Sequence, residues 1–156
     1  MKTKHMTLLI VVKDGQILLP MKKRGFGQGL YNGVGGKVEA GETVEQAAVR
    51  ECQEEIGITP INFEKFAINH FDILHKGERS HLVVHIFLAT DYTGKLQESD
   101  EMKPFWWSTD SIPFEKMWAD DLFWLPRILK GEKLECYFDF DDNNKLRSHK
   151  IMNVMY

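Results

Sequence analysis

The sequence predicts a single α+β domain in which helices pack against a mixed β-sheet. One segment, 43–57, has the apolar periodicity of a helix. Other segments, such as 7–13, 62–74 and 80–89, are rich in β-branched and aromatic residues, as is typical of strands. The chain of 156 residues has the length of one domain, and no linker, repeat or low-complexity stretch divides it, so we expect the domain to span 1–156.

The N-terminal part is predicted to form a hairpin followed by a glycine-rich loop. A strand over 7–13 turns at Asp14-Gly15 into a second strand over 16–21. The following residues, 22–36, contain a basic triplet, expected to be a solvated loop, and six glycines. They fit neither the Walker A nor the dinucleotide fingerprint, because the glycine spacing differs and no Ser or Thr follows the final Gly-Lys. We expect the glycines to let the backbone approach a ligand closely, the alternative being a flexible connection.

Segment 43–57 carries the start and stop signals of a helix. Thr43 is a good N-cap, Gln46 completes a capping box, and Gly57 is a typical C-terminal stop. A seam of apolar residues would dock this helix on a core; it consists of Val44, Ala48, Cys52 and Ile56.

Three carboxylates lie on one side of this helix. At about 100° per residue, Glu55 lies about 40° from Glu51 and Glu54 about 60° from it in the other direction. Like charges at this spacing repel each other, and negative charge is unfavourable near a helix C-terminus. A solvated acidic face is the ordinary interpretation, but this face borders the apolar seam. We therefore expect a hard divalent cation, Mg²⁺ with Mn²⁺ as a substitute, which accepts carboxylate and phosphate oxygens.

After the helix, strands over 62–74 and 80–89 are predicted to flank a turn at 76–78. The second strand is almost continuously apolar, which places it in the core. His81 and His85 share one face of that strand, and we expect surface or hydrogen-bonded core histidines rather than a metal site.

The remaining elements follow from the same signals. We expect a strand over 102–107, a helix over 113–129 with acidic residues near its start and Gly131 after its end, a strand over 133–139 and a turn at 141–144.

The stretch 36–58 resembles the signature of the Nudix hydrolase family, G-x5-E-x7-R-E-U-x-E-E-x-G-U, in which U is apolar. Cys52 departs mildly, because a larger aliphatic residue is usual there. The match is specific, and its defined positions are Gly36, Glu42, Arg50, Glu51, Cys52, Glu54, Glu55, Gly57 and Ile58. The resemblance implies a Nudix-type α/β/α sandwich, with a mixed, partly curved sheet and the catalytic helix packed against it.

Segments 21–38, 98–102 and 113–121 extend the resemblance to the 8-oxo-dGTP diphosphatase branch of that family, over nearly the whole chain. This resemblance implies Mg²⁺-dependent hydrolysis of oxidised purine nucleoside triphosphates, such as 8-oxo-dGTP and 2-hydroxy-dATP, to the monophosphate and pyrophosphate. Such a reaction sanitises the nucleotide pool and thereby supports DNA repair. Tyr31 and Ala119 depart from the branch, which bears on pocket shape and on the ranking of substrates.

The resemblance also implies roles for individual residues. The cation would be surrounded by the Gly35 carbonyl, Glu51, Glu54, Glu55 and Glu101. The catalytic group would be Arg50, Glu51, Glu54 and Glu55. From their positions alone, we expect Arg50 to orient a carboxylate and Glu42 to brace the loop, and the spacing leaves open which glutamate is the general base. The nucleotide would be contacted by Thr7, Lys22, Asn32, Val34, Gly35, Gly36, Lys37, Trp118, Asp120 and Asp121.

Elementary chemistry also favours a base pocket among these residues. Trp118 offers a flat surface for a purine, and Phe26 and Trp124 would line the same cleft. Asn32 has both a donor and an acceptor with which to read a purine edge. Core packing is the alternative for the two tryptophans.

Asp120 and Asp121 are hypothesised to face the base in a partly dry pocket. Their mutual repulsion would raise one pKa and leave a protonated carboxyl that can donate a hydrogen bond. One pocket could then accept oxidised guanine and oxidised adenine by moving a proton. A charge pair at a helix N-terminus is the alternative.

Composition limits the partners. A net charge of −3 disfavours a nucleic-acid polymer, and the apolar run 8–12 is too short to span a membrane or to serve as a signal segment. Two cysteines without metal-binding spacing suggest reduced thiols. We expect a cytoplasmic monomer acting on a small nucleoside triphosphate. The competing readings are a Nudix hydrolase of another nucleoside diphosphate derivative or of a pterin triphosphate, and a non-catalytic nucleotide sensor.

Overall fold

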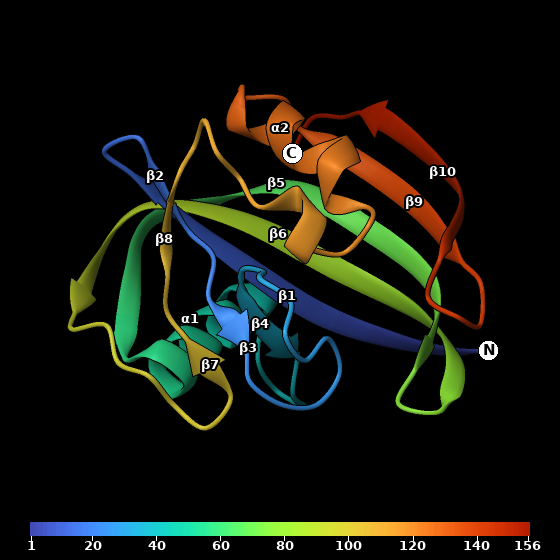
Figure 1. The fold of residues 1–156 in the computed structure, drawn as a ribbon, viewed down its shortest axis with the longest axis horizontal. Helices are drawn as coiled ribbons and strands as arrows, with labels where there is room; N and C mark the ends of the chain where they lie inside the picture. Colours follow the sequence, from blue (N-terminus) through green and yellow to red (C-terminus); the bar gives the residue numbers. More distant parts are fainter.

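The computed structural model describes all residues 1–156, and its centre is an eight-stranded mixed sheet (Figure 1). The strand order is β10-β9-β5-β6-β1-β2-β8, with β4 paired to β1, while β3 and β7 form a separate two-stranded sheet. The elements in chain order are β1 (Lys2–Lys13), β2 (Gln16–Leu18), β3 (Met21–Lys22), β4 (Val34–Lys37), α1 (Val44–Ile56), β5 (Ile58–His75), β6 (Glu78–Gly94), β7 (Met102–Lys103), β8 (Trp106–Ser108), a 3₁₀ turn (Phe114–Lys116), α2 (Asp121–Leu129), β9 (Leu134–Phe140) and β10 (Leu146–Asn153).

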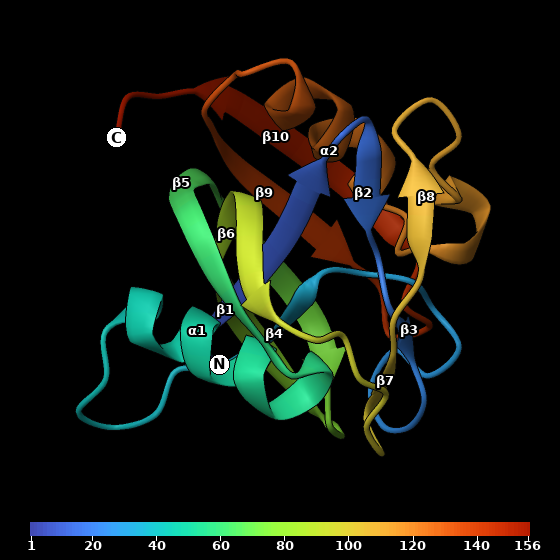
Figure 2. The ribbon, with the colours of Figure 1, turned by 90° about the vertical axis from the view of Figure 1, so that its left-hand side faces the viewer.

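The two helices cover opposite faces of the central strands (Figure 2). Successive residues of β1 show this, because side chains alternate between the faces of a strand. Leu9 and Val11 belong to the apolar cluster that includes residues of α1, whereas Ile10 belongs to the cluster that includes residues of α2. The predicted α+β sandwich with a mixed sheet is therefore confirmed. Neither helix is long and apolar enough to cross a membrane.

The expected signals of helix α1 are present. The backbone N–H of Gln46 donates to Thr43 Oγ1 at 3.1 Å, and the Thr43 N–H donates to Gln46 Oε1 at 2.9 Å. Gly57 ends the helix in the left-handed region, at φ 75°. The capping bonds satisfy N–H groups that the start of a helix leaves without partners. Both boundaries of α1 therefore lie at residues that the local sequence identifies.

Prolines divide two of the predicted strands. The strand expected over 16–21 ends at Leu18, and Pro20 separates it from β3. The strand expected over 102–107 is two short strands, β7 and β8, on either side of Pro104. Proline has no N–H to donate to a ladder, so pairing stops there. In contrast, β1 begins earlier than predicted, and β5 and β6 are longer than predicted at both ends.

The helix predicted over 113–129 begins only at Asp121. Its first part is a 3₁₀ turn, after which the Lys116 carbonyl accepts a hydrogen bond from the N–H of Tyr31 at 2.9 Å. This carbonyl is therefore used by a distant loop and not by a helix. Strand β10 was not predicted, because its exposed face is polar and basic.

His81 and His85 each lie beside a polar side chain, and the two cysteines are buried. His81 Nε2 lies 3.0 Å from His70 Nδ1, and His85 Nδ1 lies 2.9 Å from Lys65 Nζ. Cys52 and Cys136 are both buried free thiols.

Candidate active site

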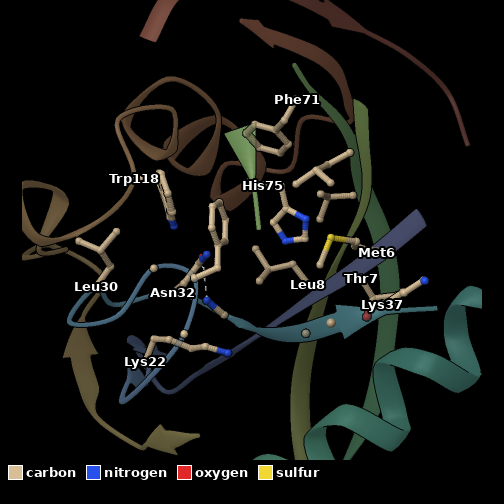
Figure 3. Close-up of a pocket in the computed structure, with 18 of the residues that line it drawn as sticks. Met6, Thr7, Leu8, Lys22, Leu30, Asn32, Lys37, Phe71, His75 and Trp118 are labelled. Atoms are coloured by element: carbon tan, nitrogen blue, oxygen red, sulfur yellow. Dashed lines mark hydrogen bonds between the residues drawn. The ribbon is translucent and has the colours of Figure 1, made fainter. Parts of the chain in front are cut away.

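A cavity of about 720 Å³ lies between the sheet, the glycine-rich loop and the start of α2. Residues from β1, β4, β5 and β6 form one side, and α1 contributes carboxylates at one end. Figure 3 shows the side chains of Asn32, His75 and Trp118 directed toward the same space from different elements. The cavity therefore joins an acidic end to a largely aromatic and apolar body.

Glu51 and Glu55 form the acidic end. They lie one helical turn apart, both line the cavity, and each residue is only 9% exposed. Burial, followed by the neighbouring charge of Glu51, raises the pKa of Glu55 to about 8. Glu55 Oε2 is buried without a hydrogen-bond partner. Two carboxylates held together out of water are unfavourable unless a proton or cation lies between them.

A side chain at position 36 would displace the Glu51 carboxylate. A Cβ atom there would lie 2.6 Å from Glu51 Oε1, well inside contact distance. At Gly35 a Cβ would lie 1.7 Å from the Thr7 carbonyl oxygen. At these glycines the backbone lies close to strand β1 and to Glu51, whereas the sequence suggested close approach to a ligand or metal.

Arg50 fixes the Glu51 carboxylate and the loop before α1 in place. Its Nε and Nη2 donate to the Glu42 carboxylate at 3.0 and 2.7 Å, and its Nη1 donates to Glu51 Oε1 at 2.9 Å. A further bond reaches the Lys37 carbonyl at 3.1 Å. Arg50 thus orients Glu51 and ties the loop before α1 to strand β4, as the sequence suggested for Arg50 and Glu42.

Two of the predicted cation ligands, Glu54 and Glu101, are paired with basic side chains. Glu54 does not line the cavity; its exposed carboxylate accepts a bond from Arg50 Nη1 at 3.2 Å. Glu101 lines the cavity but is bound by Lys22 at 3.1 Å and Arg24 at 2.8 Å. The basic triplet expected to be a solvated loop therefore contributes two side chains to the cavity rim. No group of three or more His, Cys, Asp or Glu residues is gathered in metal-binding geometry.

The residues present nevertheless fit a hard divalent cation. The donors are oxygens only, Glu55 keeps one oxygen buried and unpartnered, and Gly36 brings backbone close to Glu51. Mg²⁺-type ions are commonly bound by one or two carboxylates, with water and substrate phosphates completing the coordination.

The opposite part of the cavity has the features of a base pocket. The ring of Phe26 stacks on Trp118 with centroids 4.9 Å apart. Asn32 Oδ1 accepts a hydrogen bond from the Gly33 N–H at 2.9 Å. The side-chain nitrogen of Asn32, Nδ2, has no protein partner. Flat aromatic surface and a free donor therefore meet in one place.

Asp120 and Asp121 lie buried at the start of α2, 3% and 2% exposed, and both line the cavity. Burial raises the pKa of Asp120 to about 6, although Trp124 Nε1 donates to its Oδ2 at 2.8 Å. Burial and the charge of Asp120 raise the pKa of Asp121 well above its usual range, and Asp121 Oδ2 has no partner. Trp124 is 1% exposed and serves both core and cavity.

Most residues expected to contact a nucleotide line this cavity. Val34 is the exception: its side chain is buried in the cluster beneath α1. Sequence reasoning missed Lys4, Met6 and His75, which reach the cavity because alternate strand residues share a face. The residues confirmed as lining are Thr7, Lys22, Phe26, Asn32, Gly35, Gly36, Lys37, Trp118, Asp120, Asp121 and Trp124.

The buried aspartates make stability depend on pH. A carboxyl whose pKa is raised on folding binds its proton more tightly in the folded chain, so stability falls as pH rises through the folded pKa. We expect Asp121→Asn to have a higher free energy of unfolding than the wild type at pH 8, with the difference shrinking toward pH 5. Urea unfolding at both pH values measures this, with Asp110→Asn, an exposed residue, as the control. An equal difference at both pH values would contradict it.

Comparison with known proteins agrees with this geometry. The chain is 47% identical to the oxidized purine nucleoside triphosphate hydrolase of Danio rerio, covering 97% of this chain and 96% of the relative. It is 40% identical to the Mus musculus protein of the same name, covering 95% and 94%. A crystal structure of the MutT protein from Bacillus halodurans superimposes with a TM-score of 0.84 at 31% identity, covering 95% of this chain and 97% of that one. Residues 2–128 match the NUDIX domain, and the chain belongs to the Nudix hydrolase family, whose members generally use divalent cations.

Proposed function

We propose that this protein hydrolyses oxidised purine nucleoside triphosphates, such as 8-oxo-dGTP, to the monophosphate and pyrophosphate, with Mg²⁺ as the cation and Mn²⁺ as a substitute. One observation carries the proposal: a single cavity joins the Glu51–Glu55 pair to a pocket built from Trp118, Asn32 and two buried aspartates. The names of the Danio rerio and Mus musculus relatives support the same substrate class. The buried free cysteines are consistent with the reducing cytoplasm.

At the acidic end, the chain would bind the triphosphate and remove a proton from water. When bound, the cation neutralises phosphate charge and polarises phosphorus toward attack. Lys22 and Lys37 line this part of the cavity and add positive charge for phosphate oxygens. A glutamate that does not coordinate the cation would accept the proton of the attacking water, whichever of Glu51, Glu54 and Glu55 that is. Arg50 keeps Glu51 in position throughout.

At the other end, Trp118 would stack on the purine while polar groups read its edge. Stacking of a base on an aromatic ring contributes about 1–3 kcal/mol. Asp120 and Asp121 can share a proton between them, because burial raises both pKa values. A pair that either donates or accepts can pair with the different edges of oxidised guanine and oxidised adenine.

The proposal predicts the ranking of substrates. With Mg²⁺ present, kcat/KM for 8-oxo-dGTP should exceed that for dGTP by about tenfold or more, since the pocket holds polar groups that ordinary guanine leaves less well paired. Initial rates for 8-oxo-dGTP, 2-hydroxy-dATP and dGTP, measured side by side, test this. Turnover of a pterin triphosphate or a nucleoside diphosphate sugar in preference to all three would point to another Nudix substrate. Binding without turnover would point to a sensor.

The aspartate pair should control the choice between the two oxidised bases. Replacing either carboxyl by an amide removes the mobile proton, so Asp120→Asn and Asp121→Asn should change the ratio of 8-oxo-dGTP to 2-hydroxy-dATP turnover, by about tenfold in at least one variant. Relative kcat/KM values measure this. If both variants kept the wild-type ratio, shared protonation would be wrong.

Cation binding should be visible without substrate. Mg²⁺ at millimolar concentration should raise the thermal unfolding midpoint of the wild type by a few degrees, because it binds the folded carboxylate pair only. Glu55→Gln should be at least as stable as the wild type without Mg²⁺ and should lose the Mg²⁺-dependent shift. Glu64→Gln, whose carboxylate is paired with Lys133, is the control that keeps the shift. The same shift in Glu55→Gln would speak against this site.

A further inference from the structure

One end of the cavity carries a polar cluster that the proposed reaction leaves unused. Lys4 Nζ lies 3.0 Å from His75 Nδ1 and 3.0 Å from Glu78 Oε1. The three residues come from β1, β5 and β6, and the pairing of His75 with Glu78 closes the β5–β6 hairpin. His75 is 4% exposed and lines the cavity beside Lys4. A buried imidazole is thus fixed in place at the cavity wall.

Lys4 determines the protonation of this imidazole. An ammonium group has only donors, so Nδ1 of His75 must accept and the ring proton lies on Nε2. Burial lowers the pKa of His75 to about 4, and the charges of Lys4 and Lys76 act in the same direction, against Glu78. At neutral pH the ring is therefore uncharged, with one tautomer and one orientation.

His75 also contacts the aromatic residues of the base pocket. Its ring lies 4.7 Å from that of Phe26, nearly perpendicular at 84°. Phe26 in turn stacks on Trp118, and Phe140 meets Trp118 at 6.2 Å and 87°. A Cβ at Gly27 would lie 3.3 Å from Trp118 Nε1, so the loop backbone is close as well. Contacts run without interruption from Lys4 through His75 and Phe26 to Trp118.

We propose that His75 is a positioning residue of the base pocket, whose ring holds Phe26 against Trp118. The inference rests on the proposed function, because it takes the Trp118 wall as the surface on which the purine stacks. With the imidazole removed, Phe26 gains space to turn away from Trp118, and the wall loses its fixed distance from Asp120 and Asp121. His75 has no contact with the carboxylate pair, so its removal acts on substrate binding and not on the chemical step.

Two substitutions test separately the aromatic ring of His75 and its hydrogen-bond acceptor Nδ1. His75→Phe keeps an aromatic ring against Phe26 but cannot accept from Lys4. His75→Asn keeps an acceptor near the place of Nδ1 but has no ring. We expect His75→Asn to raise KM for 8-oxo-dGTP about 3–10-fold with kcat within about twofold, and His75→Phe to keep KM within about twofold. His81→Asn, on the opposite face of the sheet, is the matched control and should leave both constants unchanged.

Thermal unfolding of each variant distinguishes positioning from mere stabilisation. A structural role would make KM follow the unfolding midpoint, whereas positioning makes KM follow the presence of a ring. If His75→Asn does not fold, His75→Leu serves as the variant without a ring. KM unchanged in the variants without a ring, or raised equally in His75→Phe, overturns the inference alone. A wild type that neither hydrolyses nor binds oxidised purine nucleotides overturns the proposed function, and this inference with it.

Discussion

The site depends on two carboxylates, Glu51 and Glu55, that the fold holds close together and out of bulk water. Their repulsion opposes folding, so other interactions must offset it. Helix α1 supplies some of these through its capping box and its apolar seam on the sheet. Arg50 supplies others through the bonds that join Glu42, Glu51 and the Lys37 carbonyl. The site therefore forms, but its two carboxylates still repel each other unless a positive charge lies between them. A centre that hydrolyses polyphosphates needs such a binding site for a cation.

The cavity repeats this principle at its other end. Asp120 and Asp121 are buried beside one another, and binding a proton relieves their repulsion. Both acidic pairs lie at the end of a helix that packs on the sheet, α1 on one face and α2 on the other. The sheet thus separates two apolar clusters, while the cavity connects two acidic pairs whose electrostatic requirements differ.

The parts of the fold that sequence could predict are those with local signals. Thr43, Gln46 and Gly57 mark α1 within a few residues of its ends, and the glutamates follow from helical spacing. Lys4 and His75 carry no local signal, because only the long-range register of β1, β5 and β6 brings them together. Val34 was expected at the ligand, but strand alternation turns it into the core. Residues 113–120 looked helical, yet the Lys116 carbonyl is taken by a loop distant in sequence.

Strand β1 lies in the middle of the sheet and pairs in parallel with β6, for example Leu8 with Ile86. Contacts so distant along the chain carry a cost in loop-closure entropy. The pairing of β1 is therefore complete only when β6 has joined it in the sheet. Helix α1 packs on β1, β4 and β5, so the Glu51–Glu55 pair is buried only where these strands have assembled. The acidic end of the cavity is consequently a property of the assembled sheet and not of helix α1 alone.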